Sequence, residues 1–360
     1  MITAPLSATD TFNPAMERTK QLLFKPFRFA VWWRIAFLAL FTGELSGSKF
    51  NFNLPSDFRM PSRNNSSQSF AGSLPFHMPP WHELIPFIIL GALVLVALML
   101  VLIYVSSILR FVLFDAVLSG NVRIRQGWQR WRERGQLFFP WQIGYMLIMF
   151  AVFGVVFGIP VFMAWRAGLF RNPSQNLGTL ILGGLALFVV MLVVVLAGLV
   201  VFVLTKDFVV PIMAFEGVGP IDGWRRLKLM ISANKGSYAG YLGFKAVLAI
   251  AAGIVVSIIG IVIFLIVLVP IVIIAVVVGV AGSTGGAGLS ALALTALILG
   301  GIAVGLLLLF VMSMISVPVV VFFQSYALHF FGSRYEPLRA VMYPDTPPQI
   351  PPGFTPQPAM

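Results

Sequence analysis

Cysteine is absent from the 360-residue chain, and charged residues make up only 10% of it. Without a thiol, the protein forms no disulfide, holds no metal through thiolates and carries no cysteine nucleophile. Soluble domains average about 25% charged residues. A chain with 59% hydrophobic residues and so little charge lies outside that composition. The high apolar content and the shortage of charge favour one polytopic membrane bundle over a soluble protein.

Catalytic motifs are missing as well. The sequence contains no glycine-rich phosphate loop, no pair of catalytic carboxylates and no nucleophile elbow. A membrane-embedded hydrolase needs polar groups that converge inside the bilayer, and the centres of the apolar runs contain no ionisable residue. We therefore expect no ATPase activity, no other enzyme activity and no cofactor.

Long apolar runs recur along the chain, and a run of about 18 residues or more indicates a membrane-spanning helix. We predict six spans, which makes the protein an all-α integral membrane protein built from three helical hairpins. The spans are predicted at about 29–46, 84–108, 141–165, 178–205, 240–268 and 291–321. Residues 1–15 are polar and contain no signal-peptide core, so the first run is expected to remain as an uncleaved anchor.

Basic residues are distributed unevenly among the segments that flank these spans. Of the 24 Lys and Arg residues, 19 flank the first span, lie in the second and fourth connections or follow the last span. The segments on the opposite side of the predicted membrane contain the five remaining basic residues, which are Lys49, Arg59, Arg63, Arg166 and Arg171. The positive-inside rule therefore places both termini and the segments 110–140 and 206–239 in the cytoplasm, and 47–83 outside. This topology predicts a multi-pass plasma-membrane protein.

The apolar stretch 240–281 is too long for one straight span, because a helix of its 42 residues would extend about 63 Å. Two full spans here would move Arg334 and Arg339 to the outside. We therefore predict one span that is broken near Pro270, where proline removes a backbone donor. The remainder is expected to be tilted, re-entrant or packed at the outer surface.

Three stretches share one spacing, a Phe followed nine residues later by a Gly, and each closes an apolar run. They are Phe111 to Gly120, Phe208 to Gly217 and Phe323 to Gly332. A Gly-Trp pair and basic residues follow the first two stretches. We interpret the pattern as an internal repeat of three units, inserted with the same orientation. The units are predicted at about 14–120, 121–217 and 218–332, in a membrane domain that covers 1–340.

Each unit begins with a basic, amphipathic segment, which predicts an interfacial helix ahead of each hairpin. Indole rings favour the headgroup zone, and each basic residue there contributes about 1 kcal/mol of attraction to anionic lipid. The predicted lipid-interface residues are Trp128, Arg130, Trp131, Arg132, Trp224, Arg225 and Arg226. The expected partner is the anionic inner leaflet. Nucleic acid is not expected despite the net charge of +12, because the basic residues lie in short segments between apolar runs.

Few side chains are candidates for ion or metal binding. Asp115 and Glu216 could couple to an ion, although both lie near the predicted cytoplasmic boundary, where each could instead pair with a nearby arginine. His77, His82 and Glu83 are candidate metal ligands in the outer loop. Their spacing matches neither HExxH nor an i, i+4 pair on a helix, so a solvated loop is the alternative.

Two polar segments lie outside the predicted bundle. The segment 47–83 is rich in Ser, Asn and Pro and is predicted to form an external loop. Residues 343–360 contain many prolines and are predicted to form a disordered cytoplasmic tail.

A family resemblance rests on three segments, taken in order: LLFKPFRFAVWWRIAF, then FVVPIMAFEG with GWRRLKLMI, then FFQSYALHFFG. They resemble a broad group of uncharacterised bacterial and archaeal polytopic membrane proteins. They are also similar to the membrane domain that precedes the catalytic domain of some glycerophosphodiester phosphodiesterases. The chain has no phosphodiesterase domain, so that activity is not carried over. The resemblance implies a prokaryotic plasma membrane, such as the bacterial inner membrane.

Three classes of function are compatible with these features. The first is a non-enzymatic scaffold or partner subunit, held on the inner leaflet by its basic helices. The second is a transporter or channel with a pathway between the hairpins, and the third is an intramembrane enzyme. A polar cavity at mid-depth favours the second class, and a dry core favours the first.

Overall fold

The computed structural model describes residues 5–44, 81–171, 174–284 and 291–344, and within these ranges it contains helices and no strand. The helices are α1 (Phe12–Phe24), α2 (Phe29–Thr42), α3 (Trp81–Ser119), α4 (Ile124–Arg166), α5 (Leu177–Leu204), the π-helix η3 (Thr205–Val209), α6 (Val210–Glu216), α7 (Pro220–Ala233), α8 (Lys235–Thr284), α9 (Ala291–Gly332) and α10 (Glu336–Met342). The predicted all-α class is confirmed for these residues. The predicted outer loop and proline-rich tail lie largely outside them.

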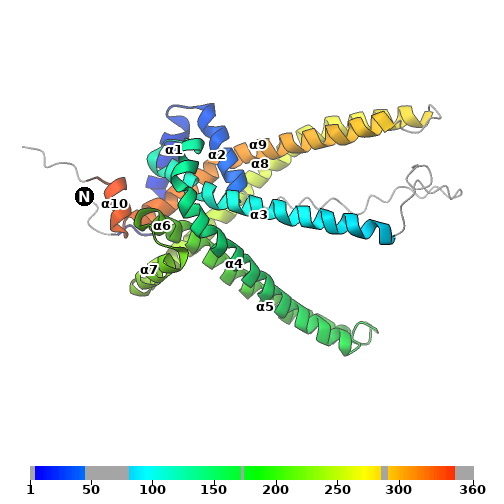
Figure 1. Ribbon diagram of the computed structural model, residues 1–360, viewed down its shortest axis with the longest axis horizontal. Coiled ribbons are helices and arrows are strands. Elements are labelled where there is room, and N and C mark those ends of the chain that lie inside the picture. Colours follow the sequence, from blue (N-terminus) through cyan, green and yellow to red (C-terminus); the bar gives the residue numbers. More distant parts are fainter. Residues whose placement is uncertain (1–4, 45–80, 172–173, 285–290, 345–360) are drawn as a thin grey trace, which may run out of the picture.

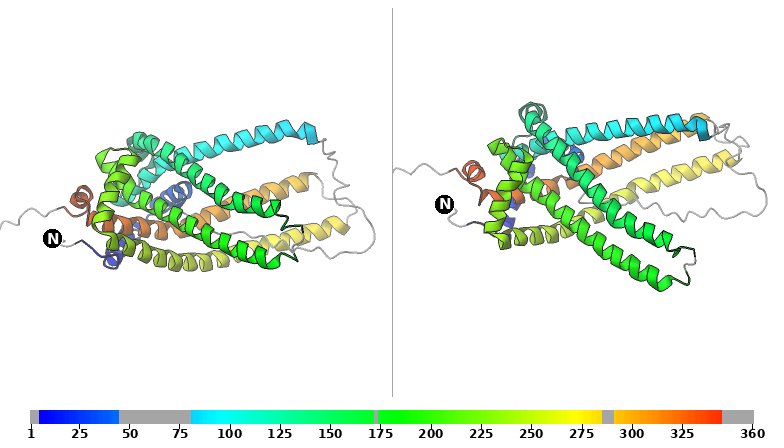
Figure 2. Two further views of the ribbon diagram at one scale, coloured as in Figure 1. Left: turned by 90° about the horizontal axis from the view of Figure 1, so that it is seen from below. Right: turned by 60° about the horizontal axis from the view of Figure 1, so that its bottom comes forward.

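The helices form a compact base from which three long arms extend in one direction (Figures 1 and 2). One arm is α3, the second pairs α4 with α5, and the third pairs α8 with α9. The base contains α1, α6, α7, α10 and the adjoining ends of the long helices. Both described ends of the chain lie at this base, and the turn between α4 and α5 lies at the opposite end (Figure 2).

Five helical segments among the described residues are long and apolar enough to cross a membrane: α3, α4, α5 continuing through η3 and α6, α8, and α9. The span predicted at 29–46 differs, because its helix α2 has only 14 residues. A helix of that length extends about 21 Å, less than the roughly 30 Å of a bilayer core. Apolar side chains on the arms are broadly exposed, as on Phe150 at 78% and Leu182 at 69%, which suits a surface covered by lipid.

Two predicted boundaries are wrong. The helix α8 runs from Lys235 to Thr284 without ending at Pro270, because a single missing donor leaves the rest of a long helix intact. The amphipathic segment of the second unit is not a separate helix, because it continues into the span as one helix, α4. Only α1 and α7 are separate amphipathic helices that precede an apolar helix.

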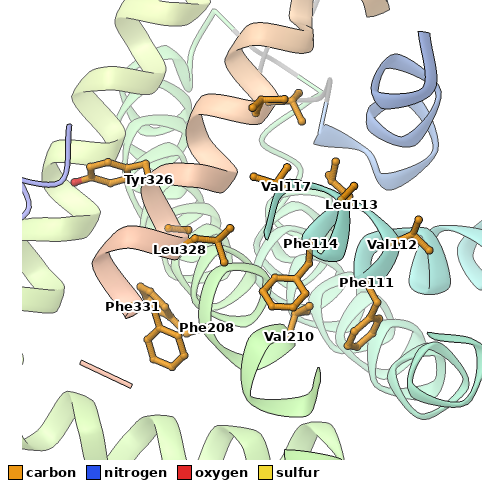
Figure 3. Close-up of a cluster of buried hydrophobic side chains, with 14 of the residues drawn as sticks. Phe111, Val112, Leu113, Phe114, Val117, Phe208, Val210, Tyr326, Leu328 and Phe331 are labelled. Atoms are coloured by element: carbon orange, nitrogen blue, oxygen red, sulfur yellow. The ribbon is translucent and has the colours of Figure 1, made fainter. Parts of the chain in front are cut away.

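The three Phe-to-Gly stretches meet in one buried cluster at the base (Figure 3). Phe114 of α3 lies edge-on to Phe215 of α6 with ring centroids 6.2 Å apart, and Phe208 of η3 contacts Phe331 of α9 at 5.1 Å. Buried aromatic pairs contribute about 0.5–1.5 kcal/mol each beyond their area. The stretches that stand out in the sequence are therefore the packing centre of the base.

Glycine allows the first two stretches to end in the same conformation. Gly120 and Gly217 have φ angles of 74° and 73°, in the left-handed region that a side chain disfavours. A neighbouring arginine donates to a carbonyl at each end: Arg18 Nη2 to the Leu118 oxygen at 2.8 Å, and Arg134 Nη1 to the Gly217 oxygen at 2.6 Å. Basic residues from the amphipathic segments thus satisfy the exposed carbonyls at two helix ends.

Candidate functional site

The apolar run of α5 ends in two adjacent charges, Lys206 and Asp207, which lie in the π-helix η3. Two residues explain the wider turn. Pro211 has no N–H to donate to the Asp207 carbonyl, and the Val210 N–H donates to the Thr205 carbonyl five residues back. Short π segments inside long helices occur frequently at functional sites. Here the turn directs two neighbouring charged side chains to different surroundings.

Asp207 is fully buried and is held by two side chains of α8. Lys245 forms an ion pair with its Oδ2 atom, and the Tyr241 hydroxyl donates to the same oxygen at 2.8 Å. Tyr241 and Lys245 are four residues apart and therefore share one face of the helix. The Asp207 Oδ1 atom accepts no hydrogen bond from any described residue. A buried carboxylate with one unsatisfied oxygen is costly unless a charged partner compensates it, and Lys245 is that partner.

Lys206 has a different partner and forms an ion pair with Glu44. Glu44 follows Gly43, whose φ of 74° ends α2 in the left-handed conformation. The side chains of Lys206 and Glu44 are 14% and 10% exposed. This pair therefore connects the end of α2 to the end of α5 at a place that is nearly, but not fully, covered by protein.

Arg110 completes the charged group from α3. Its Nη2 atom donates to the Thr42 carbonyl at 3.1 Å, and its guanidinium carbon lies 5.1 Å from the ring centroid of Phe202 and 5.7 Å from that of Phe138. The side chain is 5% exposed and interacts electrostatically with Glu44 and Asp207. A buried guanidinium between aromatic faces gains cation–π attraction, so Arg110 joins α2, α3 and α5.

These five residues, Glu44, Arg110, Lys206, Asp207 and Lys245, are called the charged cluster below. Three cations and two anions give it a formal charge of +1. Four elements far apart in the sequence supply them, so the cluster exists only in the folded chain.

A cavity of about 600 Å³ lies against this cluster, between α5, α8 and α9. Its polar lining residues include Glu44, Lys206, Lys245 and Ser316, which we call the floor of the cavity. The apolar walls are formed by Leu196, Leu199, Val200, Phe202, Val203, Leu242, Ala246, Ala249, Ala252, Val256, Val319, Val320 and Phe323. Leu196 and Leu199 are also exposed on the outside of α5, at 51% and 55%. The cavity therefore reaches the surface that the spans present to their surroundings.

The predicted ion-coupling residue Asp115 is not at this cavity. Its Oδ2 atom accepts a hydrogen bond from Trp131 Nε1 at 3.1 Å and lies 3.7 Å from Arg130. Trp131 is only 8% exposed and stacks on Phe111 at 5.9 Å. Its ring thus lies in the protein core, because the apolar face of this segment packs against α3. Trp128 is half-buried against the same core.

The second predicted ion-coupling residue, Glu216, also lies away from the cavity. It pairs with Arg226 and accepts a hydrogen bond from the Tyr335 hydroxyl at 2.7 Å. Burial and this hydrogen bond raise the pKa of the Tyr335 phenol above its ordinary value, so Tyr335 stays protonated as the donor. Asp115 and Glu216 both connect the end of one helix to the next amphipathic segment.

The other predicted lipid-interface residues lie at the base. Arg132 is exposed on α4, and Arg225 is exposed on α7 beside Asp222, with 3.1 Å between the charged atoms. Trp224 is half-buried against the core. These placements leave the two arginines available to a membrane surface, while the indole contributes mainly to packing.

The predicted metal ligands cannot be placed. His77 lies outside the described residues, as do the side chains of His82 and Glu83. Among the side chains that the structure does describe, no three of His, Asp and Glu are grouped so that they could hold a metal ion.

Sequence reasoning missed most of the charged cluster. The predicted cytoplasmic segments 110–140 and 206–239 include Arg110, Lys206 and Asp207, and the sequence predicted no role for Lys245 or Glu44. One signal was available, because Lys206 and Asp207 are adjacent within an otherwise apolar run from 178 to 215. Adjacent opposite charges in such a run indicate partners on other helices.

Comparison with known proteins gives one match. A family model described as a family of unknown function (DUF7544) matches residues 6–341. No curated protein and no solved structure matches the chain. The family match covers nearly the whole chain but gives no link to glycerophosphodiester phosphodiesterases.

Proposed function

We propose that this chain, which belongs to the DUF7544 family of unknown function, is an integral membrane protein that binds an amphipathic molecule in the cavity between α5, α8 and α9. The observation that carries the proposal is the composition of that cavity, which has apolar walls and a charged floor. Small-molecule sites typically have volumes of about 300–1,000 Å³, mostly apolar walls and a few fixed polar groups. The cavity has each of these properties.

The position of the cavity specifies the kind of molecule. Its walls belong to helices that could cross a membrane, so hydrocarbon is the natural occupant there. Lys206, Lys245 and Glu44 make one end of the cavity polar, and a polar or charged head can form hydrogen bonds there that hydrocarbon cannot form. In a molecule with an acyl chain and a polar head, the chain can contact the apolar walls while the head contacts the floor of the cavity.

We propose binding without catalysis, which includes the role of a scaffold or partner subunit. Each carboxylate of the charged cluster is already paired with a lysine. A general base needs a carboxylate that is free to take a proton from a bound substrate. This arrangement supports a site that holds a molecule over one that transforms it.

Transport is the second candidate. It is favoured by charged residues that lie within helices long and apolar enough to cross a membrane, and by the π-helix η3, which carries two of them. Reconstituted protein would distinguish the two functions. Solute or ion flux driven by an imposed gradient and abolished by Asp207→Asn supports transport, and binding without flux supports the first proposal.

The first prediction concerns cavity binding. We expect Ala252→Trp to weaken binding of a photoreactive palmitoyl probe about tenfold, which corresponds to about 1.4 kcal/mol, because Ala252 lines the cavity and the indole would occupy it. The matched control is Ala251→Trp, which places the same side chain on the exposed face of α8. Full-length protein in nanodiscs is labelled, and the labelled residues are mapped by mass spectrometry. Equal labelling of both variants, or labelling spread evenly over the exposed arms, contradicts the proposal.

We further propose that the base lies on the cytoplasmic side of a bacterial inner membrane, with both termini inside. The support is that the basic segments and both described chain ends lie at the same end of the molecule (Figure 2). Arg132 and Arg225, together with the other basic residues of the base, would face the anionic inner leaflet.

The second prediction tests this topology with an impermeant thiol reagent, since the chain has no cysteine of its own. We expect Ser174→Cys, at the turn between α4 and α5, to be labelled from outside intact cells. Gln129→Cys, exposed at the base, should be labelled only after the membrane is permeabilised. The reverse pattern would invert the proposed orientation.

The internal repeat is likewise a proposal, supported by two equivalent close approaches. A Cβ atom on Gly127 would lie 2.8 Å from a methyl of Val112, and one on Gly223 would lie 2.8 Å from a methyl of Val209. Each valine follows the first Phe of its stretch, and each glycine precedes a tryptophan. The first two units therefore use the same contact to fold the amphipathic segment back on the preceding helix.

A further inference from the structure

The two ion pairs at the floor of the cavity differ in how firmly their carboxylates are held. Asp207 is completely covered and accepts from both Lys245 and Tyr241. Glu44 has Lys206 as its ion-pair partner among the described residues, and its side chain remains 10% exposed. Glu44 also lies two residues beyond the end of α2, whereas Asp207 lies inside the π-helix η3. Of the two carboxylates, Glu44 is the one that another anion can replace.

The charge around the floor favours an anion over a cation. Arg110 faces Glu44 and Asp207 from α3, Lys206 comes from η3, and Lys245 comes from α8. From α9, the neighbouring groups are the Ser316 hydroxyl and the Phe323 ring, which add no charge. The charged cluster therefore keeps its formal charge of +1 in surroundings where apolar walls screen it little. A second cation would be repelled.

We infer that the molecule bound in the cavity carries one anionic head, a carboxylate or a phosphate, which replaces the Glu44 carboxylate on Lys206. The inference rests on the proposed function and specifies its ligand class. A head with one negative charge brings the formal charge of cluster and ligand together from +1 to 0, and Lys206 keeps an anionic partner throughout the exchange. The ammonium group of Lys206 then donates a charge-assisted hydrogen bond to the head, and the acyl chain lies against α5, α8 and α9.

Glu44 thus acts as an internal occupant that competes with the ligand. Removing its charge leaves Lys206 unpaired at the floor, and binding of an external anion then neutralises a buried cation. A neutral head gains nothing from this change. The competition gives the site a preference for anionic amphiphiles that depends on one residue.

The experiment measures photolabelling of full-length protein in neutral-lipid nanodiscs by three diazirine probes: palmitic acid, phosphatidic acid and monopalmitoylglycerol. The two acids distinguish a carboxylate from a lipid phosphate, and the glycerol ester is the neutral reference. We expect Glu44→Gln to strengthen binding of at least one acid about tenfold, the effect of a hydrogen bond to a charged group. Binding of the neutral probe should stay unchanged. Lys206→Gln should weaken binding of that acid by a similar factor.

Two controls keep the result interpretable. Glu17→Gln removes an exposed carboxylate of α1 that is paired with Lys20 at 3.3 Å, and it should change labelling by none of the probes. Glu44→Asp keeps the charge and should bind the acids as the unmodified chain does, even if Lys206→Gln does not fold. Equal labelling by acidic and neutral probes in both the unmodified chain and Glu44→Gln overturns the inference and leaves the proposed function standing. Failure of every probe to label cavity residues overturns the proposed function itself.

Discussion

Asp207→Asn is expected to lower the free energy of unfolding by about 3–5 kcal/mol, because removing one partner of a buried ion pair leaves the other charge uncompensated. The residue left alone is Lys245, which is largely buried in α8 with its ammonium group near the rings of Tyr241 and Phe323. An asparagine keeps the shape of the side chain but supplies no charge. The loss therefore reports on electrostatics, with little change in packing.

This expectation is checked by unfolding the protein with SDS in mixed micelles and following tryptophan fluorescence. Asp222→Asn is the matched control, because its pair with Arg225 is exposed, and such pairs contribute about 0–1 kcal/mol. The double substitution Asp207→Asn with Lys245→Met removes both charges and should recover much of the lost stability. Equal stability of Asp207→Asn and Asp222→Asn would show that the buried pair contributes no more to the free energy of unfolding than the exposed pair does.

Gly135→Ala is expected to cost about 1–3 kcal/mol, the usual penalty for forcing an extra methyl into a packed contact. Gly135 of α4 faces Ile108 of α3 at a tight contact between these helices. A Cβ atom there would lie 2.5 Å from Ile108 Cγ1 and 2.8 Å from Ile108 Cα. The side-chain atom could rotate away, but the backbone atom cannot, so the two helices must separate. That separation would disturb the packing around Arg110, which lies two residues after Ile108.

The same helix provides the control for this substitution. Gly144 has no atom within 4 Å of an added Cβ. Gly144→Ala is therefore expected to be neutral, or stabilising by up to about 1 kcal/mol through the higher helix propensity of alanine. Midpoints of SDS unfolding for the two variants test the contrast. If the unfolding midpoints of both variants shift in the same direction and by the same amount, helix propensity determines the effect, and the contact between α3 and α4 does not.

The sequence alone determined the features that depend on local composition. The apolar runs predicted helices at α3, α4, α5, α8 and α9, because hydropathy summed over a span is insensitive to the identity of single residues. The spacing from Phe208 to Gly217, repeated elsewhere, singled out three stretches that the structure brings together at the base, although the sequence predicted from it an internal repeat and not their packing.

Other features depend on neighbouring helices, and the sequence alone did not determine them. Trp131 has the position of an interfacial residue in the sequence. In the structure, α3 covers its ring, and the Asp115 carboxylate accepts a hydrogen bond from its indole N–H. The run at 29–46 has the composition of a span, its helix α2 ends at Thr42 within the described residues, and a sixth span is not confirmed. Amphipathic periodicity shows which residues share a face and does not show whether that face meets lipid or protein.

Only the tertiary structure decided where the candidate site lies. Glu44 and Lys206 are 162 positions apart, and Asp207 and Lys245 are 38 apart, yet both pairs contribute to the charged cluster beside one cavity. Each of these side chains, taken alone, looks like a charge at the edge of an apolar run. Low-dielectric surroundings make an ion pair strong only when its two partners are brought together. That pairing is a property of how the ends of α2, α5 and α8 pack, and no local window of the sequence contains it.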